Sequence, residues 1–99
     1  MTDARWWLVC YDVHDPARLR RCAAVLEGAG QRMQHSVFRC WLTAAGMQRL
    51  RWELTAVLAP EDDLLMIPLC ARCVGGMQTT HSSAKAPGWP DGPEPLRIL

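Results

Sequence analysis

The residues of this chain that are best suited to chemistry lie at the end of one apolar stretch near the N-terminus. Residues 6–13 carry a single charged side chain, Asp12, and are rich in aromatic and β-branched types, which predicts a buried strand. An ionised carboxylate is expensive to bury without a partner, so Asp12 is expected at an opening where it meets a cation. His14 follows closely and is interpreted either as a supporting residue of that site or as an exposed loop histidine.

Two aromatic residues near this site are predicted to support it by packing. Tyr11 is expected to point to the opposite face of the strand from Asp12, because successive side chains of a strand alternate. We therefore interpret Tyr11 as a core residue with its hydroxyl group hydrogen-bonded, and not as a catalytic acid. Phe38 is likewise interpreted as a packing residue.

The five cysteines form a second group of reactive side chains. Cys70 and Cys73 make a single Cys-x-x-Cys motif, and a structural zinc ion would need two further ligands. The scattered histidines 14, 35 and 81 are the candidates, and their positions do not favour such a site. Cysteines in apolar patterns behave as small hydrophobic residues, which indicates a reducing compartment.

The arginines are concentrated in the middle of the chain. Residues 16–59 hold seven arginines against two glutamates, although the net charge of the whole chain is +1. A basic segment is typical of a protein that binds a polyanion, and guanidinium groups bind phosphate without reading sequence. Solvation of helix faces explains the same pattern equally well. The candidates for phosphate contact are Arg18, Arg20, Arg21, Arg32 and Arg39.

The elements that position these residues follow from caps and hydrophobic spacing. Asp15 and Pro16 predict the start of a helix that Gly28 and Gly30 end. Residues 31–42 predict two short strands, or one bent strand, with a break at residues 35–36. Thr43 is expected to cap a second helix that Pro60 ends.

A last apolar strand is predicted over residues 64–70, where Pro68 indicates an edge position. A weaker extended piece is expected over residues 74–80. We predict one domain over residues 1–80 and a Pro/Gly-rich tail over residues 81–99. The chain has no membrane-length apolar run and no signal peptide, so we expect a cytoplasmic protein.

The order strand, helix, two strands, helix, strand predicts an α+β sandwich with both helices on one face of an antiparallel sheet. The other face of the sheet is then uncovered. With Trp6 or Trp7 on that face, burial against a second copy is economical, so we expect a homodimer.

Five segments in this order resemble a known family. They are residues 9–13, the helix after Asp15, and residues 30–38, 42–43 and 62–73, and they include the Arg32 and Gln34 of the family pattern. Each segment is weak alone, but the ordered set is similar to the small CRISPR-associated proteins of the "Cas two" type, the partners of the spacer integrase.

The resemblance implies a ferredoxin-like βαββαβ fold and a homodimer in which two aspartates at the position of Asp12 face each other. Asp12 would then be both the catalytic residue and the metal ligand of an endonuclease that hydrolyses phosphodiester bonds in RNA or DNA. Mg²⁺ is the expected ion, because it takes oxygen ligands and keeps several waters. The resemblance also implies a role in CRISPR adaptation, the antiviral defence step in which the dimer binds duplex DNA and bridges integrase subunits during spacer acquisition.

Two alternatives to the endonuclease stay open at this point. The protein could be a non-catalytic DNA-binding scaffold, in which case Asp12 would be dispensable for spacer acquisition. It could also be a ferredoxin-like RNA-binding module, whose sheet would expose aromatic side chains for stacking and would not form a dimer interface.

Overall fold

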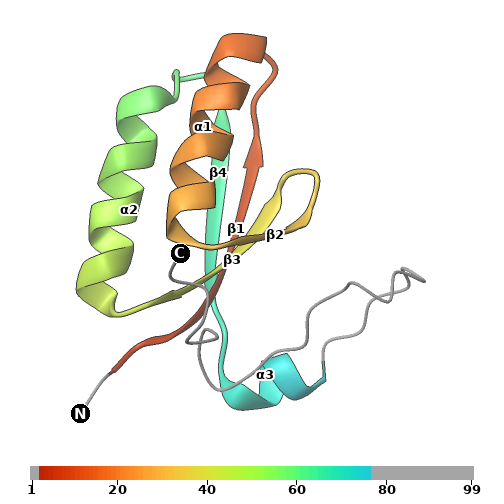
Figure 1. The fold of residues 1–99 in the computed structure, drawn as a ribbon, viewed down its shortest axis with the longest axis vertical. Coiled ribbons are helices and arrows are strands. Elements are labelled where there is room, and N and C mark those ends of the chain that lie inside the picture. The colour runs from red at the N-terminus through yellow and green to blue at the C-terminus, as the bar shows by residue number, and fades with distance from the viewer. Residues whose placement is uncertain (1–2, 77–99) are drawn as a thin grey trace.

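Residues 3–76 of the chain are described by a computed structural model, which has four strands and three helices within this range (Figure 1). In chain order the elements are β1 (Arg5–Asp12), α1 (Pro16–Ala29), β2 (Gln31–Gln34), β3 (Val37–Leu42), α2 (Ala44–Val57), β4 (Asp63–Pro68) and α3 (Ala71–Gly75). The predicted tail over residues 81–99 lies outside the described residues.

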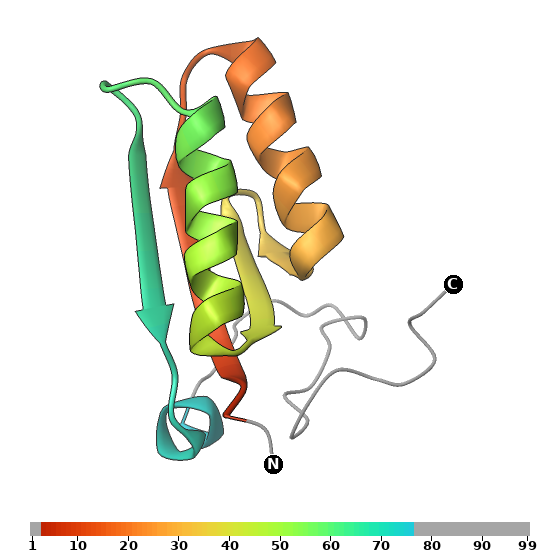
Figure 2. The same cartoon turned by 90° about the vertical axis from the view of Figure 1, so that its left-hand side faces the viewer.

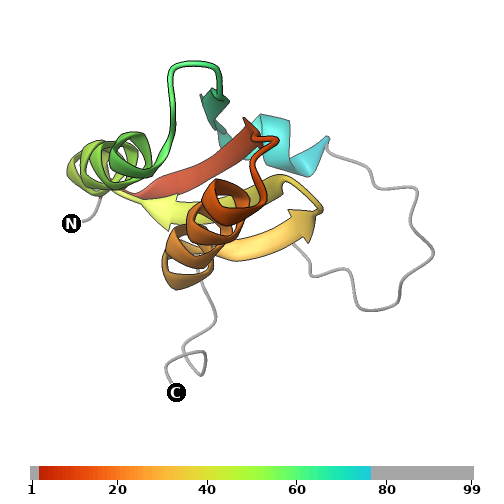
Figure 3. The same cartoon turned by 90° about the horizontal axis from the view of Figure 1, so that it is seen from above.

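The strands form one antiparallel sheet in the order β2-β3-β1-β4. The first strand of the chain is therefore central, and it is paired with β3 on one side and with β4 on the other. Helices α1 and α2 pack side by side on the same face of the sheet (Figures 2 and 3). This arrangement is the α+β sandwich that the order of elements predicted, and it has the ferredoxin-like βαββαβ order that the resemblance implied.

The core lies between this sheet face and the two long helices. Val9 in β1, Phe38 in β3 and Leu26 in α1 have no exposed surface. In β1 the residues with odd numbers from Trp7 to Tyr11 belong to the core or pack against it, whereas Asp12 is exposed. The alternation expected of a half-buried strand is therefore present, and it sends Asp12 to the face away from α1 and α2.

Both long helices begin where their capping residues predicted. The Asp15 carboxylate accepts a hydrogen bond from the Arg18 backbone N–H at 2.9 Å, and the Thr43 hydroxyl oxygen accepts one from the Gly46 N–H at 3.0 Å. Helix α1 ends before Gly30, and α2 ends at Val57, shortly before Pro60.

Gly30 connects α1 to β2 where the chain passes directly beside β3. A Cβ atom at this position would overlap the carbonyl oxygen of Arg39 and contact the Cys40 sulfur. The backbone of Gly30 is extended, so glycine is needed here for lack of space and not for an unusual backbone conformation.

The chain after α2 differs in part from the prediction. Strand β4 is an edge strand that ends at Pro68, as a proline within a strand indicates. The extended piece expected from residue 74 is wrong for Val74 and Gly75, which belong to the short helix α3, while residues 77–80 lie outside the described range. The N-cap of α3 is Cys70. Cysteine is not one of the usual capping residues, so the sequence gave no signal for this helix. None of the helices in residues 3–76 is long and apolar enough to cross a membrane.

Candidate active site at the end of strand β1

Asp12 is the last residue of β1, and its side chain is 66% exposed. The Nε2 atom of His14 lies 3.3 Å from the Asp12 Oδ1 atom, and the imidazole itself is 87% exposed. His14 is therefore an exposed histidine whose imidazole lies beside the Asp12 carboxylate. The opening expected around Asp12 is present.

A second carboxylate lies directly across the sheet from Asp12. The register of β1 and β4 pairs Asp12 with Asp63, and both residues are exposed. Like charges at directly opposite positions of an antiparallel pair repel each other, which makes this end of the sheet attractive to a cation. The sequence alone did not single out Asp63, although its place opposite Asp12 follows once β4 is paired with β1.

The donor atoms at this site match the chemistry of Mg²⁺, which prefers carboxylate oxygens and retains water ligands. One chain alone does not complete a site, since residues 3–76 contain no group of three or more His, Cys, Asp or Glu side chains placed to hold a metal ion. Asp12 and Asp63 thus supply two exposed carboxylates at one end of the sheet, fewer than a complete ligand set within one chain.

Tyr11 and Phe38 lie behind the site, on the covered face of the sheet. Tyr11 is 5% exposed, its hydroxyl donates to the His35 carbonyl oxygen at 3.4 Å, and its ring stacks on Phe38 with centroids 6.2 Å apart. Burial raises the pKa of the Tyr11 hydroxyl above its usual value, although nearby Arg32 opposes this shift. Both aromatic residues are therefore packing residues, as predicted.

Arg32 is bound to the protein around it. Its guanidinium group lies 4.8 Å from the Phe38 ring centroid and donates to the His35 carbonyl oxygen at 2.6 Å. A further nitrogen lies 3.3 Å from the Glu27 carboxylate. These contacts hold Arg32 against the turn between β2 and β3. Its side chain is still 40% exposed, so part of it stays in solvent.

Arg18 binds the loop before β4. Its Nε and Nη2 atoms donate to the two Asp62 oxygens at 2.8 and 3.3 Å, and Nη2 also lies 3.1 Å from Glu61. The Asp62 side chain is only 1% exposed and accepts the Ala59 N–H at 2.8 Å. The hydrogen bond from Arg18 holds the pKa of Asp62 below its usual value. The sequence alone did not reveal this pair, because Arg18 and Asp62 are far apart in the chain.

The remaining three arginines differ strongly in exposure. Arg20 and Arg21 are exposed on α1. Arg39 is 3% exposed, donates to Gln31 Oε1 at 2.6 and 3.0 Å, and lies 4.8 Å from a Trp6 ring centroid. The structure therefore does not present Arg39 as a surface group, and Arg20 and Arg21 are better placed to meet phosphate.

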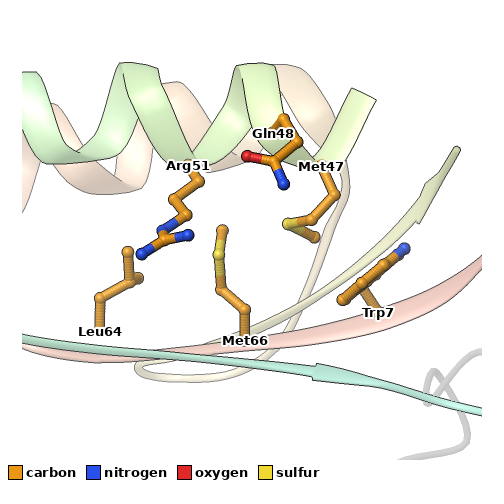
Figure 4. Close-up of a pocket in the computed structure, with 6 residues that line it drawn as sticks. All are labelled: Trp7, Met47, Gln48, Arg51, Leu64 and Met66. Atoms are coloured by element: carbon orange, nitrogen blue, oxygen red, sulfur yellow. The ribbon is translucent and has the colours of Figure 1, made fainter. Parts of the chain in front are cut away.

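A groove on the helix side of the sheet is separate from these residues. It has a volume of about 340 Å³ and lies between α2 and β4 (Figure 4). Arg51 and Gln48 point into it from α2, above Leu64, Met66 and Trp7. None of the predicted site residues lines this groove, so the candidate site is the open end of β1 and β4.

Comparison with known proteins places this fold and site in a family. The family model described as "CRISPR associated protein Cas2" matches residues 5–77. The chain belongs to the Cas2 family. The recognition made from the sequence is therefore confirmed, and β1 with Asp12 lies within the matched residues.

Similar proteins support this assignment over most of the chain. A Synechocystis sp. protein named "CRISPR-associated endoribonuclease Cas2 2" is 41% identical over 97 residues, which cover 95% of this chain and 96% of the relative. The Streptococcus pyogenes Cas2 crystal structure at pH 6.5 is 32% identical, with a TM-score of 0.70 over 77% of this chain and 99% of that one. A Thermus thermophilus protein described as hypothetical is 32% identical, with a TM-score of 0.66 over 68% and 83% of the two chains. The ferredoxin-like Cas2 fold is thus shared with experimental structures.

Proposed function

We propose that this Cas2 protein is a Mg²⁺-dependent endonuclease that hydrolyses phosphodiester bonds in RNA or DNA at Asp12. The observation that carries the proposal is the exposed Asp12 carboxylate at the mouth of an apolar strand, with Asp63 directly opposite. The relatives named as endoribonucleases support the same chemistry.

The active form in this proposal is a homodimer with a cytoplasmic location. The sheet face away from α1 and α2 carries apolar side chains, including Leu65, which is 57% exposed, and half-buried Leu8 and Ile67. Covering these residues with a second copy stabilises the dimer, and it brings a second Asp12 toward the first. The incomplete set of one chain would then become a full ligand set.

Within this site the chain's own residues have separate roles. The Asp12 carboxylates of the two copies would hold the ion, and His14 contacts Asp12 at 3.3 Å. Bound Mg²⁺ supplies charge stabilisation for the phosphate and lowers the pKa of an attacking water. Arg20 and Arg21 contact phosphates of the nucleic acid from the exposed face of α1.

A scaffold role in CRISPR adaptation is the second part of the proposal, in which the dimer binds duplex DNA and an integrase subunit during spacer acquisition. Arg20 and Arg21 support it, because both are exposed on α1 and can contact the phosphates of a duplex. The RNA-binding module with a stacking sheet is disfavoured, because Trp6 in the central strand is only 7% exposed.

The cleavage proposal is tested with Asp12→Asn and a matched control, Glu53→Gln, which neutralises another exposed carboxylate on α2. The purified protein is incubated with single-stranded RNA, single-stranded DNA and duplex DNA, with Mg²⁺ or with a chelator. We expect Mg²⁺-dependent cleavage that Asp12→Asn lowers by about 100-fold or more and Glu53→Gln leaves unchanged. Cleavage that survives Asp12→Asn or the chelator would contradict the proposal, and the substrate that is cut decides between RNA and DNA.

The scaffold part is tested by charge reversal on two helices. The double variant Arg20→Glu, Arg21→Glu is compared with Arg49→Glu, Arg51→Glu, which changes the charge equally on α2. We expect the α1 variant to weaken duplex binding and to lower the salt slope by about 0.9 for each phosphate that the protein no longer neutralises. Equal effects of the two variants would show that α1 is not the contact surface.

A further inference from the structure

Cys70 and Cys73 form a pair of thiols at the start of α3, outside the candidate active site. Their Sγ atoms are 3.4 Å apart, and both residues are exposed. The Cys73 backbone N–H also donates a hydrogen bond to Cys70 Sγ at 3.4 Å. Two sulfur atoms in contact on the surface can be joined by a small rotation of either side chain, since a disulfide needs about 2.05 Å between them.

The other three cysteines lie in different surroundings. Cys22 and Cys40 have no exposed surface, and burial raises the pKa of each thiol to about 11. Cys10 is half-buried, and burial raises its pKa as well. The pKa of Cys70 is lowered instead, first by the hydrogen bond from the Cys73 N–H. Because the thiolate is the reactive form, Cys70 is the thiol of this chain that is prepared to attack.

We propose that Cys70 and Cys73 form a redox-active dithiol that reacts with low-molecular-weight disulfides, such as oxidised glutathione. In this reaction Cys70 is the attacking thiol and Cys73 is the resolving thiol. The inference does not depend on the nuclease, because neither residue belongs to the site at Asp12.

The reaction proceeds by two thiol–disulfide exchanges. The Cys70 thiolate attacks one sulfur of the small disulfide, which forms a mixed disulfide and releases one small thiol. Cys73 then attacks Cys70 Sγ, which forms the internal disulfide and releases the second small thiol. The two cysteines lose two electrons and two protons, and the small disulfide takes up both as it becomes two thiols.

The position of the pair gives the oxidation a structural effect. A hollow of about 530 Å³ is lined by Cys70 and Val74, and by Trp6 and Trp41 from the sheet. A disulfide across the first turn of α3 would fix the wall of this hollow. The redox state of the pair is therefore expected to change the surface beside the end of β4.

The experiment equilibrates the full-length protein with glutathione buffers of increasing oxidised fraction, followed by acid trapping, alkylation and mass spectrometry. We expect the internal Cys70–Cys73 disulfide to accumulate, while Cys10, Cys22 and Cys40 stay reduced. In the native protein Cys70 should be alkylated about tenfold or more faster than Cys10.

Variants separate the two roles. Cys73→Ser should accumulate glutathione on Cys70, because nothing resolves the mixed disulfide, whereas Cys70→Ser should lose the rapid alkylation. Cys10→Ser is the matched control and should leave the redox titration unchanged. A persistent mixed disulfide in the unmodified protein, or alkylation at similar rates at Cys10 and Cys70, would overturn the proposal. Protection of both thiols that a chelator removes would overturn it too, in favour of a metal site.

Discussion

The two faces of the sheet are made by alternate residues of the same strands, yet they serve different ends. On the covered face Val9, Tyr11 and Phe38 are buried against the helices. On the other face Asp12 and Leu65 are exposed. Tyr11 and Asp12 are neighbours in the chain, so one peptide unit separates a packing residue from a candidate catalytic one. Changes to the two faces should therefore act on different properties, folding stability on one and binding or chemistry on the other.

The strongest test of this difference removes a large side chain from each face. Phe38→Ala should lower the free energy of unfolding by about 3–5 kcal/mol, because the ring is fully buried and leaves a cavity. Leu65→Ala should change it by about 0.5 kcal/mol or less in the monomer, since its side chain is largely in solvent. Urea unfolding at low protein concentration measures both, and similar losses would show that the outer face also belongs to the folding core.

A smaller loss of stability is expected from a substitution at Gly30, where the chain passes from α1 into the sheet. Gly30→Ala should destabilise the fold by about 1–3 kcal/mol, because the new methyl group collides with the Arg39 backbone. Gly28→Ala, in the last turn of α1, is the matched control, because a Cβ there has nothing within 4 Å. It should stabilise the protein by up to about 1 kcal/mol, through better helix propensity. A melting temperature that falls for Gly30→Ala and rises for Gly28→Ala would confirm the close contact. Equal shifts of the two melting temperatures would refute it.

The adjacent pair Tyr11 and Asp12 sharpens the comparison further. Tyr11→Phe should cost about 1 kcal/mol of stability through loss of the hydrogen bond to His35, and it should leave cleavage unchanged. Asp12→Asn should alter stability by about 0.5 kcal/mol or less, with a gain expected because repulsion with Asp63 is removed. Cleavage lost in the tyrosine variant would assign Tyr11 a chemical role that its burial does not suggest.

The last effect depends on pH and concerns the ion pair of Arg18 with Asp62, whose side chains are 24% and 1% exposed. The lowered pKa of Asp62 means that this pair stabilises the protein above the usual aspartate pKa of about 4 and loses its effect as the pH falls through the lower, folded value. Arg18→Ala should therefore be less stable than the unmodified chain at pH 7, and the difference should shrink toward pH 3. Urea unfolding measures the free energy of unfolding of both proteins at each pH. If their difference does not depend on pH, the loss comes from the packing of the arginine side chain and not from the ion pair.

The sequence predicted most of the fold because its local signals agree. Asp15 with Pro16 and Thr43 are strong helix starts, and Pro68 marked the edge strand. Helix α3 was missed because five residues with a cysteine cap carry no periodic pattern. Local signals therefore set the boundaries of long elements but not of short ones.

A residue of the candidate site could be predicted only where its type differed from the rest of its own segment. Asp12 met that condition as the lone charge in an apolar run. Asp63 and the Arg18–Asp62 pair did not, because their meaning depends on the register of β1 with β4 and on the loop before β4. The buried position of Arg39 also depends on tertiary contacts, since an arginine within a short strand is expected to be exposed. Pairing between distant segments was the information that the sequence did not carry.

The central place of β1 in the sheet has a consequence for how the protein is made. This strand is translated before both of its neighbours in the sheet, β3 and β4. Until both neighbours have emerged, the strongly apolar strand β1 has unpaired backbone groups along at least one of its edges. Such an edge favours aggregation or chaperone binding. The nascent chain can close its sheet only after Pro68 has been synthesised, so translation speed across residues 43–68 should govern how much protein folds correctly.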